Sequence, residues 1–496
     1  MQGIFCVFIG KIVWKSRQVR DKMENGFASE ALLGKMFPEW VQGLWKGYGY
    51  RKMKTYIKDM TQGRPAGLLL SFMLPMVVGN VFQQMYNLVD SMIVGKYVGA
   101  DALAAVGATS SLNFLFFSLC GGMSNGIGIV ISRNFGAGRE SEVKKAIANA
   151  AYIMLAAGVA MGTLGTAFAR PVLTLLHTPE NILDQSVRYM QIMCAGVLAV
   201  AMYNCVSAIL RGVGDSKTPL YFLIVSSVLN IGLDLFFVRV LHAGVTGAGI
   251  ATIIAQFLAG VGSLLFAMVN NPFFKIKKAL LKADRDIIIQ CVKIGVPLAM
   301  QTSLIAISCI ILQSVVNTFG SVVVAAFTAT NRIEQLVQQP YNSLCMAMST
   351  YTGQNIGADK LDRVRLGFRK GCLIMGIFSL IVLPLAQFGG EVIMEFFVNE
   401  RDVIEFGTKA LQITSWFYLS LGMIYVTRGT LNGSGDAFFA FASGGVEMIG
   451  RICLARPLTM IPFLGVWGIW FATAFTWLLT AIFSMIRYYQ KIGRRK

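Results

Sequence analysis

Long apolar stretches separated by short polar loops run through most of the chain. Each stretch is about 20 residues or longer, which is enough for an α-helix to cross the hydrocarbon core of a bilayer. The pattern therefore predicts an all-α polytopic membrane protein with twelve transmembrane helices. They are expected near residues 66–95, 102–132, 144–169, 184–211, 218–240, 245–269, 287–317, 323–352, 365–389, 403–431, 437–460 and 466–488.

The first predicted span carries four polar side chains on one helical face, at spacings of three, four and three residues. They are Asn80, Gln83, Asn87 and Asp90. An ionisable Asp90 inside an apolar span is costly in hydrocarbon, so we expect it to face a wet cavity or a polar partner. Pro75 lies fifteen residues earlier, where its missing N–H would bend the helix. This combination suggests a transporter; the alternative is a kinked helix whose aspartate is permanently tied to a neighbour.

Composition and charge agree with a membrane location. The chain is 55% hydrophobic and 14% charged, with a mean hydropathy of +0.61, which excludes an ordinary soluble protein. The net charge of +19 comes from bases in short loops and at the ends, as the positive-inside rule requires, and not from a nucleic-acid-binding patch. Both termini are therefore expected in the cytoplasm. The nine cysteines lack C-x-x-C spacing and only two histidines occur, so no metal site is expected beyond a transported ion.

An internal repeat with an offset of 221 residues organises the chain. Leu210-Arg-Gly-Val-Gly-Asp matches Leu431-Asn-Gly-Ser-Gly-Asp, and Asn134-Phe-Gly-Ala matches Asn355-Ile-Gly-Ala. An offset of six helices preserves orientation, which predicts two parallel six-helix repeats related by an axis along the membrane normal and facing a central cleft. The predicted parts are a cytoplasmic extension (1–60), an N-lobe (61–270), a basic cytoplasmic linker (271–286), a C-lobe (287–490) and a basic tail (491–496).

The N-terminal extension has no clean span of 20 residues. Met53 opens a stretch that looks like a natural cytoplasmic start, so we expect residues 1–52 to be disordered, dispensable or mis-started.

Further polar residues gather on the fifth and sixth predicted spans. Asn230 and Asp234 are four residues apart and share a helical face, and Thr252 and Gln256 do the same on the next span. With Asp90 they would form a set of oxygen ligands that can hold a hard cation or share protons. The alternative for Asp234 is a structural pairing near a helix end, because an arginine follows five residues later.

The second half of the chain repeats the pattern of spans and turns but lacks residues equivalent to Asp90 and Asp234. In the repeat register Asn230 corresponds to Arg451 and Asp234 to Ala455, which predicts an ion site in the N-lobe only. Glu447 lies four residues before Arg451, and this spacing predicts a structural ion pair on one helix.

No ATP site is found. The Gly-x-Gly-Asp segments after Leu210 and Leu431 lack the G-x-x-x-x-G-K-[ST] pattern of a phosphate loop. They are interpreted as turns in which glycine ends one helix and aspartate begins the next. We therefore expect transport driven by an ion gradient, with no cofactor, through a permissive cavity rich in methionine and aromatic groups. The candidates for cavity or substrate contact are Gln83, Tyr86, Asn87, Tyr203, Gln256, Glu334 and Gln338.

These residues together resemble the multidrug and toxic compound extrusion (MATE) family, over roughly residues 60–490. The resemblance rests on Pro75 to Asp90, the block after Gly99, Asn134-Phe-Gly-Ala and the paired Gly-x-Gly-Asp turns. Asn230-x-x-x-Asp234 followed by Thr252 resembles the cation-binding set of the DinF-like prokaryotic branch. The resemblance implies a V-shaped cleft and antiport, in which H⁺ or Na⁺ entry drives export of cationic or amphipathic compounds. It also implies that the coupling ion is bound by Asp90, Asn230, Asp234 and Thr252, and that Pro75 is the bending point.

Two other functions are alternatives to an exporter. A lipid-linked oligosaccharide flippase of the same superfamily would need several cleft arginines, and few are available. An enzyme would need a nucleophile–base or metal constellation, and no such motif occurs. The expected protein is thus a monomeric, multi-pass exporter of the plasma membrane whose partners are the bilayer and small substrates, without nucleic acid. Because H⁺ and Na⁺ use the same oxygen ligands, the residues leave the coupling ion open.

Overall fold

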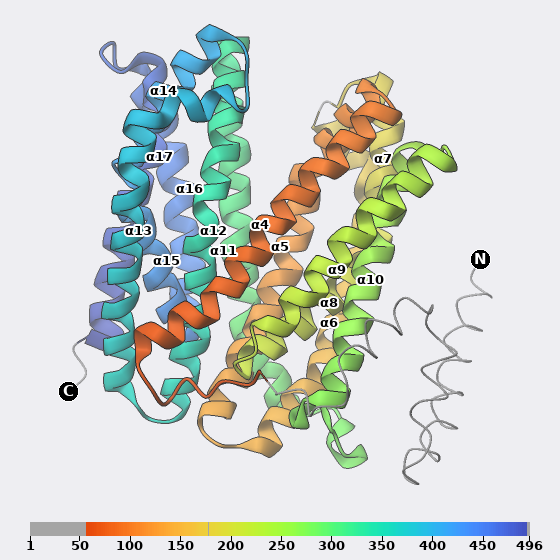
Figure 1. Cartoon of the computed structure of the whole chain (residues 1–496), viewed down its shortest axis with the longest axis vertical. Helices are drawn as coiled ribbons and strands as arrows, with labels where there is room; N and C mark the ends of the chain where they lie inside the picture. Colours follow the sequence, from red (N-terminus) through yellow and green to blue (C-terminus); the bar gives the residue numbers. More distant parts are fainter. Residues whose placement is uncertain (1–55, 177, 494–496) are drawn as a thin grey trace. The chain divides into compact units, whose positions relative to one another are not determined.

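The computed structural model describes residues 56–176 and 178–493, so the predicted N-terminal extension lies outside the described residues up to residue 55. All regular secondary structure in this part of the chain is helical (Figure 1). The first half contains α4 (Pro65–Tyr97), α5 (Ala100–Gly136), α6 (Glu140–Leu175), α7 (Glu180–Ala195), α8 (Val197–Gly212), α9 (Lys217–Asp234) and α10 (Gly244–Asn270). The second half contains α11 (Arg285–Val316), α12 (Ser321–Gly357), α13 (Leu361–Glu395), α14 (Arg401–Ser415), α15 (Tyr418–Gly433), α16 (Ala437–Met460) and α17 (Gly468–Tyr488).

These helices occupy the twelve predicted spans. Within the described ranges, nine single helices are long and apolar enough to cross a membrane. The pair α7 and α8, bent by 44° at its break, counts as one more. The two remaining predicted spans correspond to α12 and to the pair α14 and α15, which are helical over the expected residues but more polar.

Helices α4 to α10 pack as one lobe and α11 to α17 as another, and the first helix of each lobe reaches into the opposite lobe (Figure 1). Leu69 and Phe72 of α4 are buried in one cluster with Tyr341 and Met348 of the C-lobe. Correspondingly, Cys291 of α11 is buried in the main cluster of the N-lobe. The two lobes therefore exchange equivalent helices, so the exchange itself follows the symmetry of two parallel repeats about one axis.

Glycines bring the two lobes into backbone contact where α5 and α12 end. A Cβ built on Gly136 would lie 1.9 Å from the carbonyl oxygen of Gln354, and one on Gly357 would lie 1.9 Å from that of Arg133. In the repeat register Gly136 is equivalent to Gly357, and Arg133 to Gln354. The two contacts are thus one contact repeated about the pseudo-two-fold axis.

The two Gly-x-Gly-Asp turns have the predicted form. Gly214 and Gly435 adopt positive φ angles of 91° and 69°, which glycine tolerates without strain. The side chain of Asp215 accepts a hydrogen bond from the backbone N–H three residues later at 3.0 Å, and Asp436 does the same at 3.2 Å. Asp436 is thus the N-cap of α16, and Asp215, one residue before the N-cap of α9, binds an N–H group of the first turn of α9. Both segments are turns between helices, as predicted.

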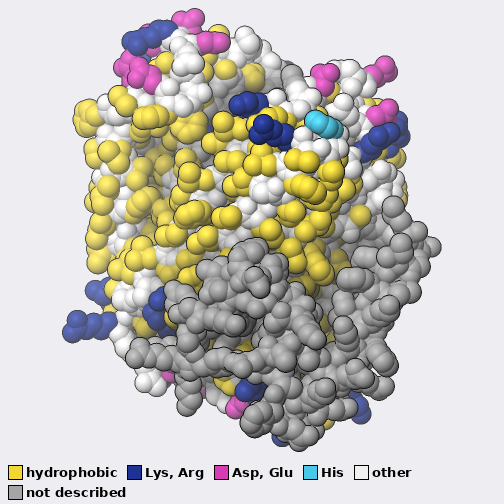
Figure 2. Space-filling model, turned by 45° about the vertical axis from the view of Figure 1, so that its right-hand side comes forward, with side chains coloured by type: hydrophobic (Ala, Val, Ile, Leu, Met, Phe, Trp, Pro, Cys, Tyr) yellow, Lys and Arg dark blue, Asp and Glu magenta, His cyan; other side chains and the backbone are white. Residues whose placement is uncertain are grey.

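Hydrophobic and charged side chains are segregated along the long dimension of the helices. Figure 2 shows a broad hydrophobic band with charged side chains gathered above and below it. We call the end that contains the loops α5–α6, α8–α9 and α12–α13 the basic end, because it carries Arg133, Arg139, Lys144, Lys145, Lys217, Lys360, Arg363, Arg365, Arg369 and Lys370. The opposite end includes the acidic side chains Glu391, Glu400, Asp402 and Glu405.

Candidate functional site

Helix α4 links the two lobes and carries the first candidate residues. Its N-terminal part packs on the C-lobe, whereas Ile93 and Val94 near its other end pack on Tyr189 and other N-lobe residues. Pro75 lies inside this helix, before the point where Gly79 meets α9. A proline cannot donate the hydrogen bond that would hold the turn before it, so the helix is weakened just ahead of the passage from one lobe to the other.

Asp90 and Asp234 lie together in the N-lobe, one on α4 and the other at the last residue of α9. Their carboxyl groups are close enough to interact directly. The side chains of Asp234 and Asn230 are 0% and 2% exposed. One oxygen of Asp90, both oxygens of Asp234 and both polar atoms of Asn230 are buried without a hydrogen-bond partner in the described chain. A buried polar site left so incompletely satisfied favours binding of a proton or a cation.

No basic side chain in the described ranges forms an ion pair with either carboxyl. Arg239, the sequence-predicted structural partner of Asp234, instead lies over the ring of Tyr97 at 5.4 Å. The helix itself changes here, because a π-helical turn spans Leu235–Val240 directly after Asp234. Such wide turns occur often at functional sites. The alternative that Asp234 is held by a neighbouring base is therefore not supported.

Aromatic and amide groups surround the carboxyl pair. Tyr86, one turn before Asp90 on α4, interacts with Gln83, with Gln256 of α10 and with both carboxyls. Tyr189 of α7, 6% exposed, also interacts with both carboxyls and with Tyr86. Sequence reasoning missed Tyr189, because an uncharged tyrosine in a span is ordinary and only the packing of α7 brings it to the site.

Thr252 lies one turn before Gln256 on α10 and is half-buried. Within the described residues its hydroxyl forms no hydrogen bond with either carboxyl group, so its predicted role as a ligand stays a prediction. Asn87 is exposed on α4.

The other candidates lie away from the carboxyl pair. The hydroxyl of Tyr203 donates to the carbonyl oxygen of Pro219 at 3.1 Å, toward the basic end. Gln338 accepts a hydrogen bond from Tyr425 at 3.2 Å within the C-lobe. Glu334 is buried in the C-lobe, with one carboxyl oxygen unpartnered.

The charges of the C-lobe are arranged differently from the prediction. The prediction of an ion pair between Glu447 and Arg451 is wrong, because Glu447 forms its ion pair with Arg428 of α15. Arg451 donates to the hydroxyl of Ser308 at 2.6 Å instead, and Glu334 has Arg451 as its charged neighbour. Spacing on one helix favoured the first pairing, but the close approach of α15 to α16 decided the second.

The donor set of the N-lobe suits a proton or a hard cation. It offers the carboxylate oxygens of Asp90 and Asp234 and the amide oxygen of Asn230, which are the ligand types that Na⁺-sized cations accept. Within the described ranges there is no group of three or more His, Cys, Asp or Glu side chains that could hold a metal ion.

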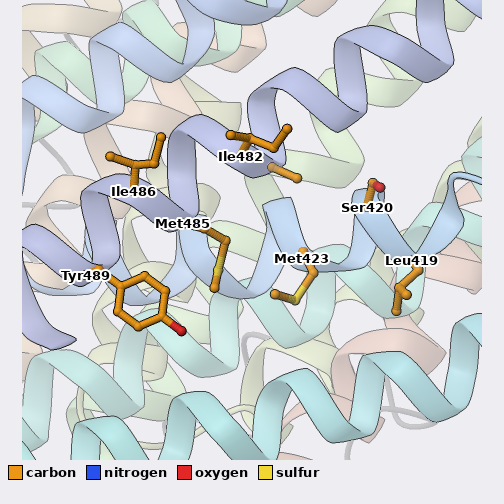
Figure 3. A pocket seen from close by; sticks show the side chains of 8 residues that line it. Leu419, Ser420, Met423, Ile482, Met485, Ile486 and Tyr489 are labelled. Atoms are coloured by element: carbon orange, nitrogen blue, oxygen red, sulfur yellow. The ribbon is translucent and has the colours of Figure 1, made fainter.

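A pocket of about 390 Å³ lies elsewhere, between α15 and α17. Figure 3 shows its lining, which includes Met423, Met485 and Tyr489 and is almost entirely apolar. Tyr489 is 53% exposed on the outer surface, and none of the sequence-predicted site residues borders the pocket. It is therefore separate from the candidate ion site.

A family model described as MatE matches the chain twice, over residues 75–236 and 297–455. The chain belongs to the MATE family. The two matches begin at Pro75 and Pro297, inside the first helix of each lobe, and so follow the internal repeat.

Curated relatives and solved structures agree with this family. The chain is 31% identical to the probable multidrug resistance protein YoeA of Bacillus subtilis, over 86% of this chain and 93% of the relative. It is 28% identical to the probable multidrug resistance protein YpnP of the same organism, over 90% and 98%. A MOP superfamily transporter from Pyrococcus furiosus, 21% identical, superposes with a TM-score of 0.83 over 89% of this chain and 98% of that one.

The fold class is confirmed by these structural neighbours, which are MATE transporters with twelve helices and a V-shaped cleft. The MATE protein described here is thus a multi-pass transporter of the plasma membrane.

Replacing Pro75 with alanine is expected to slow transport several-fold while leaving the protein at least as stable. Alanine restores the missing helical hydrogen bond, and proline in an ordinary helix interior costs about 3 kcal/mol relative to alanine. Initial transport rates and thermal unfolding would be measured in parallel. Pro171→Ala is the control, because Pro171 also lies inside a helix but is exposed on α6. An unchanged rate for Pro75→Ala would show that the helix need not bend there.

Proposed function

We propose that this MATE protein is a secondary active multidrug exporter that couples inward movement of H⁺ or Na⁺ to export of amphipathic or cationic compounds. The observation that carries the proposal is the buried carboxyl pair Asp90 and Asp234, which has no basic partner in the described chain and several unpartnered polar atoms. Two negative charges cannot stay uncompensated in a low-dielectric interior, so such a pair favours binding of a cation or proton.

Coupling follows from the position of this pair on α4. Because the N-terminal part of α4 packs on the C-lobe and its C-terminal part packs on the N-lobe, a change in charge at Asp90 alters the energy of a helix shared by both lobes. Pro75 supplies a weak point in that helix. Ion binding can therefore shift the balance between conformations that open to opposite sides, which is the requirement for alternating access.

The substrate class is supported by the relatives, which are multidrug resistance proteins. The charge distribution supports an orientation with the basic end and both termini in the cytoplasm. We propose that the protein acts as a monomer without a cofactor.

The flippase alternative is weaker than the exporter. Of its three candidate arginines, Arg428 is bound to Glu447 and Arg451 to Ser308, whereas Arg332 is exposed. A pyrophosphate group would need free guanidinium groups, and two of the three are already engaged.

Efflux of a fluorescent organic cation from reconstituted vesicles tests the proposal. H⁺ and Na⁺ gradients would be imposed separately, and export under one of them would identify the coupling ion. Movement of no organic cation under either gradient would contradict the exporter and make the flippase the working hypothesis.

A further inference from the structure

Residues 56–63, which we call the strap, form a non-helical segment that leads into α4 at the basic end. Its central residue, Met60, is 0% exposed, which is unusual for a segment outside the helices. The strap makes distinct sets of contacts with the two lobes, and each set involves a turn between helices.

The first half of the strap rests on the α8–α9 turn of the N-lobe. Ile57 packs against the main N-lobe cluster, and Lys217 lies over the ring of Tyr56 at 5.0 Å. A Cβ built on Gly214 would lie 2.1 Å from the carbonyl oxygen of Lys58, so the strap backbone touches this turn directly. Only glycine permits such an approach, and its φ of 91° makes any other residue there strained.

The second half of the strap is held by the α12–α13 turn of the C-lobe. The side chain of Asn355 donates to the carbonyl oxygen of Met60 at 3.1 Å. Lys360 donates to the carbonyl oxygen of Thr61 at 3.1 Å. Arg363 donates to the carbonyl oxygens of Met60 and Gly63, at 3.3 and 3.0 Å. These are charge-assisted bonds for the most part, and such bonds are stronger than neutral ones.

Gln354 joins the strap to both lobes. Its side-chain oxygen accepts from the backbone N–H of Met60 at 2.8 Å, and its nitrogen donates to the carbonyl oxygen of Gly212 at 3.1 Å. Its backbone is the surface against which Gly136 packs. The strap is therefore built onto the same contact that closes the two lobes at the basic end.

We propose that the strap is a latch that stabilises the closed basic end and must leave one of its two anchors when the lobes separate there. This inference rests on the proposed alternating access. The lobes cannot move apart at α12 and the α8–α9 turn while Lys58, Met60 and Gln354 keep their present contacts, because those contacts reach both sides. The strength of the anchors thus sets the population of the state that is open at this end.

Labelling of Cys291 reports the opening without any transport assay. Cys291 is 0% exposed and its carbonyl oxygen lies 3.2 Å from a Cβ built on Gly126, so it sits at the contact between the lobes. The full-length protein in vesicles would be treated with N-ethylmaleimide, without substrate or gradient. The labelling rate at Cys291 would be followed by mass spectrometry.

Arg363→Ala is expected to raise the labelling rate of Cys291 by about tenfold or more, because the variant loses the charge-assisted hydrogen bonds from Arg363 to the strap. Arg365→Ala is the matched control, since Arg365 lies in the same turn of α13 but binds Asp362 and the carbonyl of Ile492. Gly214→Ala disturbs the N-lobe anchor and should also raise the labelling rate of Cys291. If Arg363→Ala does not fold, Gly214→Ala tests the latch by itself.

Equal labelling of Cys291 in wild type, Arg363→Ala and Gly214→Ala would overturn the latch. An equal rise in Arg363→Ala and Arg365→Ala would also overturn it, because loss of loop charge would then explain the effect. A latch effect in a protein that moves no organic cation would refute the proposed function and leave the latch in place.

Discussion

Asp90→Asn is expected to lower gradient-driven efflux at least tenfold. Asparagine keeps the size and polarity of the side chain but can neither ionise nor take up a proton, so the buried pair loses one of its two charges. A tenfold change needs only ~1.4 kcal/mol, and a cation next to a carboxylate is worth about 4 kcal/mol at an effective dielectric constant of 20. The tenfold loss of efflux is therefore the smallest effect that we expect.

Efflux from vesicles would be compared for wild type, Asp90→Asn and Asp402→Asn. Asp402 is exposed in the first turn of α14, so the same substitution there should leave the rate unchanged. Asp234→Asn should reproduce the loss, because both carboxyls belong to one site. Full efflux by Asp90→Asn would show that Asp90 is structural and that the proposed ion site is wrong.

Gly357→Ala is expected to reduce transport about tenfold or more by preventing closure of the basic end. The new methyl group would lie 1.9 Å from the carbonyl oxygen of Arg133, and a backbone atom cannot move aside as a flexible side chain can. The lobes must separate to relieve this overlap, which destabilises the closed conformation and shifts the population toward the opposite state. Labelling of Cys291 should rise while efflux falls.

The internal repeat provides a second test of the same contact. Gly136→Ala places its methyl group 1.9 Å from the carbonyl oxygen of Gln354, the equivalent position, and should have the same effect. Gly121→Ala is the control, because a Cβ at Gly121 meets nothing within 4 Å. Normal transport and labelling in both Gly136→Ala and Gly357→Ala would show that the transport cycle does not use this closed contact.

The sequence alone was sufficient for the helical architecture. The backbone of an apolar span of about 20 residues can form all its hydrogen bonds in lipid only as a helix. The 221-residue offset preserves helix direction, so the parallel repeat followed from the sequence. The turns at Gly214 and Gly435 were also determined locally, since a positive φ and an aspartate cap depend on a few neighbouring residues. Asp90 and Asp234 could be singled out because a charge inside an apolar span is rare.

Contacts between distant segments were decided only by the tertiary structure. Tyr189 reaches the carboxyl pair because α7 packs against α5 and α10, and Glu447 binds Arg428 because α15 approaches α16. The strap is a further case, since nothing in residues 56–63 shows that Gln354 and Arg363 will hold them. Helical periodicity determines which residues share a face, but the partner of that face depends on how whole helices cross and slide against one another. Sequence therefore determined the helices and their charges, and packing determined which charges and backbones meet.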